Sequence, residues 1–396
     1  MISVDEALAR IRAAVLPRPS IVVPLEQASG RVLAEPVAAR LDQPPFAASA
    51  MDGYAVRAAD VSMGAVLTKI GVSQAGKGFD GLVSQGQCVR IFTGAPVPKG
   101  ADAVVMQERT EVDGAKVTVL AGVQAGTNIR PQGNDFAQGD ILSAAGEVMT
   151  PARIALAAAA NHATCTIMSP PSLALMATGD ELILPGTTIE TDQIVASNSF
   201  GLTAMFSPYC GDIIDCGIVP DDRARLATEI GSALDRNPDV FVTTGGASVG
   251  EHDFVKDVLK ENGVDIDFWR IAVRPGKPLM FGRKGATLVF GLPGNPVSAM
   301  VTAHVFVLPA LRALLGTSEP APLRLPLGAE IPQNGPRRHF LRAQMRAGPD
   351  GMTTVLPIAQ TDSGHLSSLA QADCLIVQPE GDMGRIAGEP VEVVVL

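Results

Sequence analysis

The 396-residue chain has few aromatic residues, few cysteines and few histidines, and each shortage excludes a class of function. Aromatic residues make up 4% of the sequence, and acidic residues outnumber basic ones to give a formal charge of −10. Proteins that bind nucleic acids need clustered lysines and arginines, usually with aromatic side chains on which bases stack. We therefore expect no nucleic-acid partner.

The cysteines and histidines are too scattered for a disulfide framework or a zinc site. The five cysteines, at positions 88, 165, 210, 216 and 374, form no CxxC pair, and an odd number fits a reducing compartment. The five histidines form no HExxH motif, so any metal should be a hard cation held by oxygen. We also find no apolar run near the roughly 18 residues of a membrane helix, and no signal-peptide core. We expect a cytoplasmic protein with no membrane partner.

Apolar residues are abundant, at 46% of the chain, which is enough to build the cores of about two to four domains. Residues 1–18 place apolar side chains at helical spacing behind Ser3, which predicts a capped amphipathic helix. Short apolar runs broken by glycine and proline continue to about residue 150 and predict β-strands. Thr150 and Pro151 then begin a second predicted helix.

From Leu173 the sequence alternates apolar strands with amphipathic helices, which is typical of a doubly wound parallel sheet. Two further strand-like runs, IDFWRIAVRPG and ATLVFGLPGN, lead into a long apolar helix from about Pro296 to Leu315. After the linker-like GTSEPAPLRLPLG come four short strand patterns. The sequence therefore predicts an α/β and β multidomain protein of four units.

Polar or glycine-rich segments follow every predicted strand of the central domain. In open parallel sheets, ligands bind beyond the carboxyl ends of the strands. The residues expected there are Thr178, Gly179, Asp180 and Glu181; Asp221 and Asp222; Gly245, Gly246, Ser248 and Asp253; and Gly294, Asn295 and Ser298. Four such segments in register indicate one ligand site.

The glycine-rich run from Thr243 to Gly250 could present backbone N–H groups to an anion, as phosphate-binding loops do. It has no Walker lysine, which argues against a P-loop triphosphatase. Taken alone, this run and the Gly291–Pro296 segment could equally be tight turns without a ligand.

Three carboxylates, Glu181, Asp221 and Asp253, each follow a separate strand and could together bind one Mg²⁺ ion. The alternative is that each favours a helix N-terminus, and for Asp221 this is the stronger interpretation. Three cations, Arg270, Arg274 and Lys277, stand among prolines after an apolar strand. They suit a compact oxyanion better than a merely solvated face.

Six motifs, PFAASAMDGYAV, FTGAPVP, ATGDEL, TTGGASVGEHDFV, RPGKPLMFG and GLPGNPVSA, resemble in this order the MoeA family, which is related to the gephyrin E domain. The resemblance extends over essentially the whole chain. It implies a homodimer, with a molybdopterin-binding α/β domain and a C-terminal small β-barrel. It also implies four domains: residues 1–42 with 137–170, residues 43–136, residues 171–318 and residues 319–396.

The resemblance further implies a reaction in which adenylylated molybdopterin and molybdate give molybdenum cofactor and AMP, with Mg²⁺ assisting. Molybdopterin adenylyltransferase and recipient molybdoenzymes are then expected partners. The implied catalytic residues are Asp52, Thr93, Asp135, Glu181 and Asp253, and the implied metal ligands are Glu181, Asp221 and Asp253. The implied molybdate pocket comprises Arg274, Lys277, Ser298, Arg337 or Arg342, and Ser363, and the prolines of the PGNP turn are Pro293 and Pro296.

Several positions depart from the common pattern of the family. Arg270 and Arg274 stand where many members carry lysine, and the planar guanidinium would change the geometry of oxyanion binding. The usual GEADY is GEHDF here, with Asp253 kept, and Asp140 is an alternative to Asp135. Two rival functions are the adenylyltransferase that makes the adenylylated pterin and a non-catalytic scaffold. The additional domains argue against the first, and the retained acids and cations argue against the second.

Overall fold

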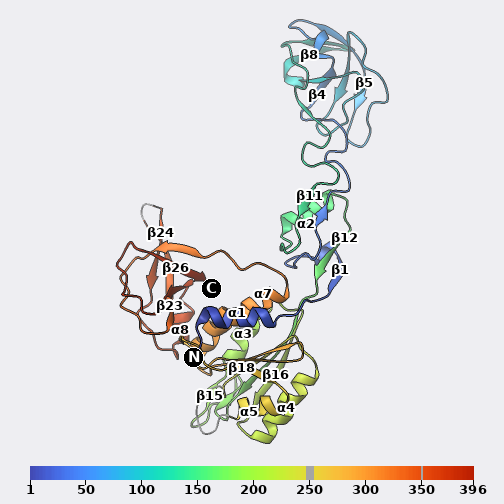
Figure 1. Ribbon diagram of the computed structural model, residues 1–396. Coiled ribbons are helices and arrows are strands. Elements are labelled where there is room, and N and C mark those ends of the chain that lie inside the picture. Colours follow the sequence, from blue (N-terminus) through green and yellow to red (C-terminus); the bar gives the residue numbers. More distant parts are fainter. Residues whose placement is uncertain (247–253, 349–350) are drawn as a thin grey trace. The chain divides into compact units, whose positions relative to one another are not determined.

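The protein is described from a computed structural model, drawn in Figure 1, in which residues 1–246, 254–348 and 351–396 are described. Contacts within the chain divide it into two compact units. The α/β unit comprises Met1–Ile21, Gly30–Ala34 and Ile167–Leu396, and the β unit comprises Val22–Ser29 and Glu35–Thr166. The finer division into four domains stays a prediction.

The α/β unit contains a six-stranded sheet in the order β16-β13-β17-β21-β20-β18. The first four strands, Asp212–Val219, Ser172–Thr178, Val240–Thr244 and Thr287–Leu292, are parallel, as predicted. The last two, β20 (Met280–Lys284) and β18 (Asp265–Phe268), run antiparallel to their neighbours, so the two further strand-like runs give the sheet an antiparallel edge. The cause is local, because only Gly285 and Ala286 connect β20 to β21 and so short a turn forces a hairpin.

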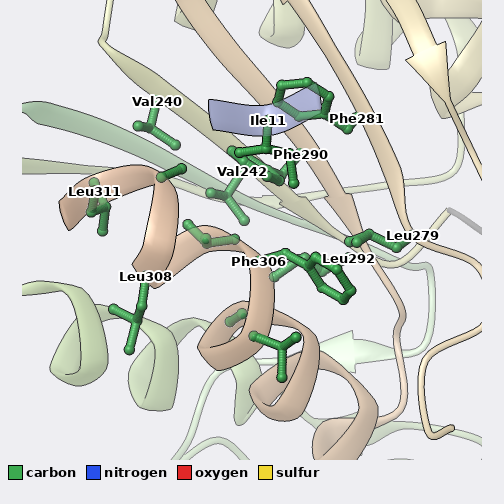
Figure 2. Packing of buried hydrophobic residues seen from close by; sticks show 14 of the residues in the cluster. Ile11, Val240, Val242, Leu279, Phe281, Phe290, Leu292, Phe306, Leu308 and Leu311 are labelled. Carbon is green, nitrogen blue, oxygen red and sulfur yellow. The ribbon is translucent and has the colours of Figure 1, made fainter. Parts of the chain in front are cut away.

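Helices cover both faces of this sheet. Alternate strand residues point to opposite faces, and so Leu175 and Val242 belong to one core cluster while Met176 and Phe241 belong to another. The first cluster is covered by α1 (Val4–Ala14), α3 (Asn198–Phe206), α6 (Pro296–Thr302) and α7 (Leu308–Leu314). The second is covered by α4 (Arg223–Asp235) and α5 (Val255–Glu261). Figure 2 shows Ile11 of α1 among the sheet residues of the first cluster.

The long apolar helix is present but not uniform. A π-helical segment, Ala303–Val307, separates α6 from α7, just before Pro309, whose ring lacks the N–H that a regular helix uses. The 19-residue span Pro296–Leu314 contains an 18-residue window with a mean hydropathy of 1.6, so the expectation that no apolar segment approaches membrane-helix length is wrong. In the folded chain, 83% of this window is buried, as expected for the core helix of a globular domain.

Two predicted helix starts show the expected caps, and a third is capped by the residue next to the expected one. Ser3 accepts a hydrogen bond from the Glu6 N–H, and Thr150 accepts one from Arg153 at the start of α2 (Pro151–Ala159). Asp222, not Asp221, caps α4 by accepting from the Arg225 N–H. The capping role considered for Asp221 therefore falls to its neighbour.

The C-terminal strands form a small barrel. β23 (Arg338–Ala347) lies between β24 (Thr353–Pro357) and β25 (Cys374–Gln378), and β26 (Pro390–Val395) leads on to β22 (Leu323–Pro326). A bridge between Leu327 and Val355 joins the two ends. The run IDFWRIAVRPG divides between the two sheets, since β19 (Val273–Arg274) pairs with β23 of the barrel.

The β unit is built on a six-stranded sheet in the order β7-β4-β6-β5-β9-β8, which confirms the β-rich prediction for this part of the chain. These strands are Ala103–Met106, Gly53–Val56, Gln87–Ile91, Val66–Ser73, Lys116–Val119 and Thr110–Asp113. The shorter elements of the whole chain are β1 (Ser20–Pro24), β2 (Val37–Ala38), β3 (Ala48–Ser49), β10 (Ile129–Arg130), β11 (Ile141–Ser143), β12 (Thr164–Met168), β14 (Leu182–Ile183), β15 (Ile194–Val195) and α8 (Leu366–Leu369), with 3-10 turns at Leu25–Gln27, Ala58–Asp60 and Gln107–Arg109.

Candidate active site

A cavity of about 390 Å³ lies beyond the carboxyl ends of β13, β17 and β21, where the sequence predicted a ligand site. We call it the glycine cavity. Of the residues predicted to bind substrate, Thr178, Gly179, Gly245, Gly246, Pro293, Gly294, Asn295 and Pro296 line it. Three separate segments of the sequence therefore meet around one space.

The glycines of this cavity permit a close approach of backbone segments. Gly245 has a φ of +89°, and a Cβ atom there would overlap the Thr178 carbonyl oxygen. A Cβ on Gly294 would lie 3.7 Å from the Gly245 Cα, so the two loops are in contact. At Gly179, φ is +150° and a Cβ would stand 2.6 Å from the Glu181 carboxylate. Glycine leaves these backbones free to approach a ligand closely.

Two of the three predicted metal ligands, Glu181 and Asp221, line the glycine cavity. Asp180 does not line the cavity. The Asp180 carboxylate accepts a hydrogen bond of 3.0 Å from the Asp221 N–H and so fixes the backbone at this edge of the cavity. Ser248 and Asp253 lie outside the described residues. Among the residues that the structure describes, no cluster of three acidic, histidine or cysteine side chains could by itself hold a metal.

A second cavity, of about 590 Å³, adjoins the first, and both are lined by Pro278 and Asn295. We call it the basic cavity. All the residues predicted to bind molybdate line it, namely Arg274, Lys277, Ser298, Arg337, Arg342 and Ser363. Gly276 has a φ of +95° and packs so closely on Thr302 of α6 that a Cβ would overlap that side chain. This contact fixes the turn between Arg274 and Lys277 against the helix.

The basic side chains of this cavity differ in how they are held. The guanidinium of the buried Arg342 donates to Ser368 Oγ at 2.5 Å and to the carbonyls of Gln360, Asp362 and His365. Burial lowers the pKa of Arg342 below its usual value. Arg274 and Lys277 are exposed. Arg342 therefore shapes the loop of residues 358–365, and the exposed cations are better placed to meet an anion.

Two hydrogen bonds tie the PGNP turn to the barrel side of the basic cavity. Asn295 Nδ2 donates to Ser363 Oγ at 3.0 Å, and the Val297 N–H donates to the Ser363 carbonyl at 3.1 Å. Ser363 thus lies where the two cavities meet. Arg270, by contrast, is not part of either lining, and its guanidinium carbon lies 4.2 Å from the centre of the Trp269 ring.

His339 lines the basic cavity and was not singled out from the sequence. Burial, together with the charges of Arg274, Arg337 and Arg342, lowers its pKa to about 4. The register of β19 against β23 places Arg274 opposite His339. His339 is therefore neutral at pH 7, and the positive charge of the cavity comes from lysine and arginine.

Sequence reasoning also missed one wall of the glycine cavity. Leu182, Ile194 and Val195, from the short strands β14 and β15, and Asn198 at the start of α3 line it. Asn198 Nδ2 donates to the Gly294 carbonyl at 2.8 Å. A partly exposed Ile-Val pair in a polar segment is a weak signal, since isolated surface apolar residues are common. The cavity therefore combines an apolar wall with polar loops.

In the β unit, two of the predicted residues form a pair. Asp52 Oδ1 accepts hydrogen bonds from the Thr93 N–H at 2.7 Å and from Thr93 Oγ1 at 2.8 Å. These bonds, with a smaller contribution from Arg90, lower the pKa of Asp52. Asp135 is exposed, and no hydrogen bond joins it to this pair within the described ranges. Its alternative, Asp140, accepts from the Ala137 N–H in a local turn.

Models of three protein families match successive parts of the chain. Residues 2–161 match the MoeA N-terminal region, residues 174–313 a probable molybdopterin binding domain, and residues 324–396 the MoeA C-terminal region. The α/β domain that carries the glycine cavity thus belongs to the molybdopterin-binding class.

Whole-chain comparisons name the family. Proteins named molybdopterin molybdenumtransferase from Haemophilus influenzae and from a Nostoc species are 32% and 34% identical to this chain. The alignments cover 99% and 95% of this chain, and 98% and 88% of those relatives. The crystal structure of a molybdopterin biosynthesis MoeA protein from Pyrococcus horikoshii superposes with a TM-score of 0.85 at 28% identity, covering 100% of each chain. The chain belongs to the MoeA family.

Proposed function

We propose that this chain, a transferase of molybdenum cofactor biosynthesis, inserts molybdate into adenylylated molybdopterin and releases AMP. The observation that supports this most directly is the pair of adjoining cavities. One has glycine loops and an apolar wall, which suit a pterin and a phosphoanhydride, and the other is basic and suits a small oxyanion. Asn295, which lines both, would stand where the two substrates meet.

The charges explain why two cavities of different character are needed. Molybdate is a dianion, and adenylylated molybdopterin carries phosphates, so bringing them together in a partly dry site costs free energy unless cations offset it. Arg274 and Lys277 would supply that charge from a turn that Gly276 fixes against α6. Ser298 and Ser363 would donate hydroxyl hydrogen bonds to the oxyanion. The glycine loops would meanwhile hold the anhydride with backbone N–H groups.

Magnesium is a chemically reasonable participant. Mg²⁺ commonly binds one or two carboxylates together with substrate phosphates, and Glu181 and Asp221 offer two carboxylates in the glycine cavity. Asp253, as predicted from the resemblance, would be the third. The ion would neutralise charge on the leaving phosphate oxygens. Asp52, Thr93 and Asp135 of the β unit would complete the catalytic set.

The wider setting is proposed from the resemblance and from composition. We expect a homodimer in the cytoplasm that receives the adenylylated pterin from molybdopterin adenylyltransferase and passes its product to molybdoenzymes. The net charge of −10 and the scarcity of aromatic residues favour small-molecule substrates over nucleic acid.

A substitution at Lys277 tests the assignment of the cavities. Loss of one charge-assisted hydrogen bond to a desolvated anion costs roughly 1.5 to 3 kcal/mol, which is about a tenfold to hundredfold change in affinity. Because Lys277 is exposed and partly screened by solvent, we expect Lys277→Ala to raise the half-saturating molybdate concentration by about tenfold. Binding of the adenylylated pterin should be unchanged, and excess molybdate should restore turnover.

The matched control is Lys260→Ala, which removes an exposed lysine from the last turn of α5, outside both cavities. It should behave like the parent. If Lys277→Ala instead weakens pterin binding and leaves the molybdate response unchanged, then Lys277 contacts the nucleotide phosphates and the basic cavity is assigned wrongly.

A further inference from the structure

Arg90, on β6 of the β unit, connects three segments that surround the Asp52–Thr93 pair. Its Nη1 donates to the Gly53 carbonyl at 3.1 Å, and its Nη2 donates to Gln107 Oε1 at 2.6 Å. The guanidinium carbon also lies 4.7 Å from the centre of the Phe92 ring, within the range of a cation–π contact.

These contacts are made next to the groups that hold Asp52. Gly53 directly follows Asp52, and Phe92 directly precedes Thr93, whose N–H and hydroxyl both donate to Asp52 Oδ1. The Gln107 N–H donates to the Asp52 carbonyl at 3.1 Å. Arg90 therefore restrains the backbone that follows the carboxylate, the segment that donates to the carboxylate and the segment that donates to the Asp52 carbonyl.

The arrangement leaves half of the carboxylate available. Within the described part of the chain, Asp52 Oδ2 accepts no hydrogen bond, and the residue is half-buried. A carboxylate with one oxygen held by two donors and the other open has a fixed direction in which it can accept a proton, a hydroxyl group or a cation. The restraint matters because catalytic groups act only within a narrow range of positions.

We infer that Arg90 is a positioning residue for the reaction, which acts by fixing the Asp52–Thr93 pair with the second carboxylate oxygen open. This inference rests on the catalytic role proposed for Asp52. The planar guanidinium is required because one group must donate in two directions and stack on Phe92 at the same time. A lysine ammonium would keep the charge but lose the stacking and the fixed fork.

The test compares Arg90→Lys with the parent in steady-state molybdenum insertion. We expect kcat to fall by about tenfold to hundredfold, since a displacement of about 1 Å can have effects of that size. The KM values for molybdate and for the adenylylated pterin should stay unchanged, because the two cavities lie in the other unit. The control is Arg57→Lys, which alters an arginine of the same unit that pairs with Asp60 at 3.7 Å. It should match the parent.

The same Arg90→Lys change is then made in an Asp52→Asn chain, with the residual rate measured. If Arg90 acts through Asp52, adding Arg90→Lys to the Asp52→Asn chain should not lower the residual rate any further. An equal loss in both backgrounds, or a parent-like kcat in Arg90→Lys, overturns the inference. Asp52→Asn with parent activity would instead refute the role proposed for Asp52 itself.

A folding defect is excluded by the unfolding temperature of each variant. If Arg90→Lys does not fold, Gln107→Ala replaces it, because Gln107 is exposed and its loss removes the Nη2 anchor and, besides that, a 3.3 Å hydrogen bond to the neighbouring Glu108. We expect a smaller fall in kcat that again disappears in the Asp52→Asn background. Parent kcat in a folded Gln107→Ala would then overturn the inference.

Discussion

His304 should make the α/β unit sensitive to mild acid. The residue lies in the π-helical segment between α6 and α7 and is 9% exposed. Burial, and then the nearby Arg312 charge, lower its pKa to about 4, and the Val395 backbone opposes this only in part. In the unfolded chain an ordinary histidine has a pKa of about 6.5. Unfolding therefore takes up a proton at any pH between these two values.

The sign and size of the effect follow from this difference. Because the unfolded state binds more protons, stability falls as pH decreases from about 6.5 to about 4 and is constant beyond either limit. A difference of about 2.5 pKa units corresponds to about 3 kcal/mol once the pH lies below both values. At pH 5, about 2 kcal/mol of the unfolding free energy is lost. His339, with a similar pKa, adds a loss of the same sign.

The assay is urea unfolding at pH 7 and pH 5, followed by the fluorescence of Trp269. That residue is the only tryptophan of the sequence and belongs to the α/β unit. His304→Gln should change the unfolding free energy through packing by an amount that does not depend on pH. It should also reduce the loss of unfolding free energy between pH 7 and pH 5 by about 2 kcal/mol. The control is His365→Gln, at an exposed histidine. An unchanged pH dependence in His304→Gln would show that His304 titrates normally and is not desolvated.

Three further predictions concern the site. Gly245→Ala should weaken binding of the adenylylated pterin by at least about tenfold, because a positive φ costs roughly 1 to 2 kcal/mol and the Cβ would overlap the Thr178 carbonyl. The control is Gly316→Ala, at a φ of +69° with nothing within 4 Å of the added Cβ. It has the backbone cost without the overlap and should bind the adenylylated pterin normally in the same titration. Glu181→Gln should still bind the adenylylated pterin but release AMP more slowly at limiting Mg²⁺, and unchanged turnover there would refute a metal role. If the β unit of one subunit serves the α/β unit of its partner, mixed Asp52→Ala and Glu181→Ala chains should recover about a quarter of parent activity, whereas no recovery in demonstrated heterodimers would refute sharing.

Local signals predicted the elements and the strand-end loops well. The caps at Ser3 and Thr150 depend on residues three positions away, so the sequence contains all the information they need. The glycine loops can also be recognised in the sequence, because only glycine permits the close backbone approach at Gly245. Since parallel strands end at one edge of a sheet, the order of the loops was enough to place them around one cavity.

What the sequence did not reveal depends on contacts between distant segments. The antiparallel edge follows from a two-residue turn at Gly285, which lacked the usual Asn-Gly or Asp-Gly signal. Ile194 and Val195 look like ordinary surface residues until the fold brings them to the glycine cavity. Arg90 is one arginine among many in the sequence, and its contacts beside Asp52 are visible only once β4 and β6 pair.

The basic cavity shows most clearly why its cations could be predicted but its construction could not. Arg274 and Lys277 are three positions apart in the sequence, and their charge is evident there. However, β19 leaves the central sheet to pair with β23 of the barrel, so Arg274 lies opposite His339, which is distant in the sequence. On the other side, Gly276 packs on Thr302 of α6, and Asn295 reaches Ser363. The cavity therefore exists only because the barrel and the α/β domain are joined by these contacts. An α/β domain alone could retain the glycine loops, but it would lack the wall that contributes Arg337, His339 and Ser363 to the basic cavity.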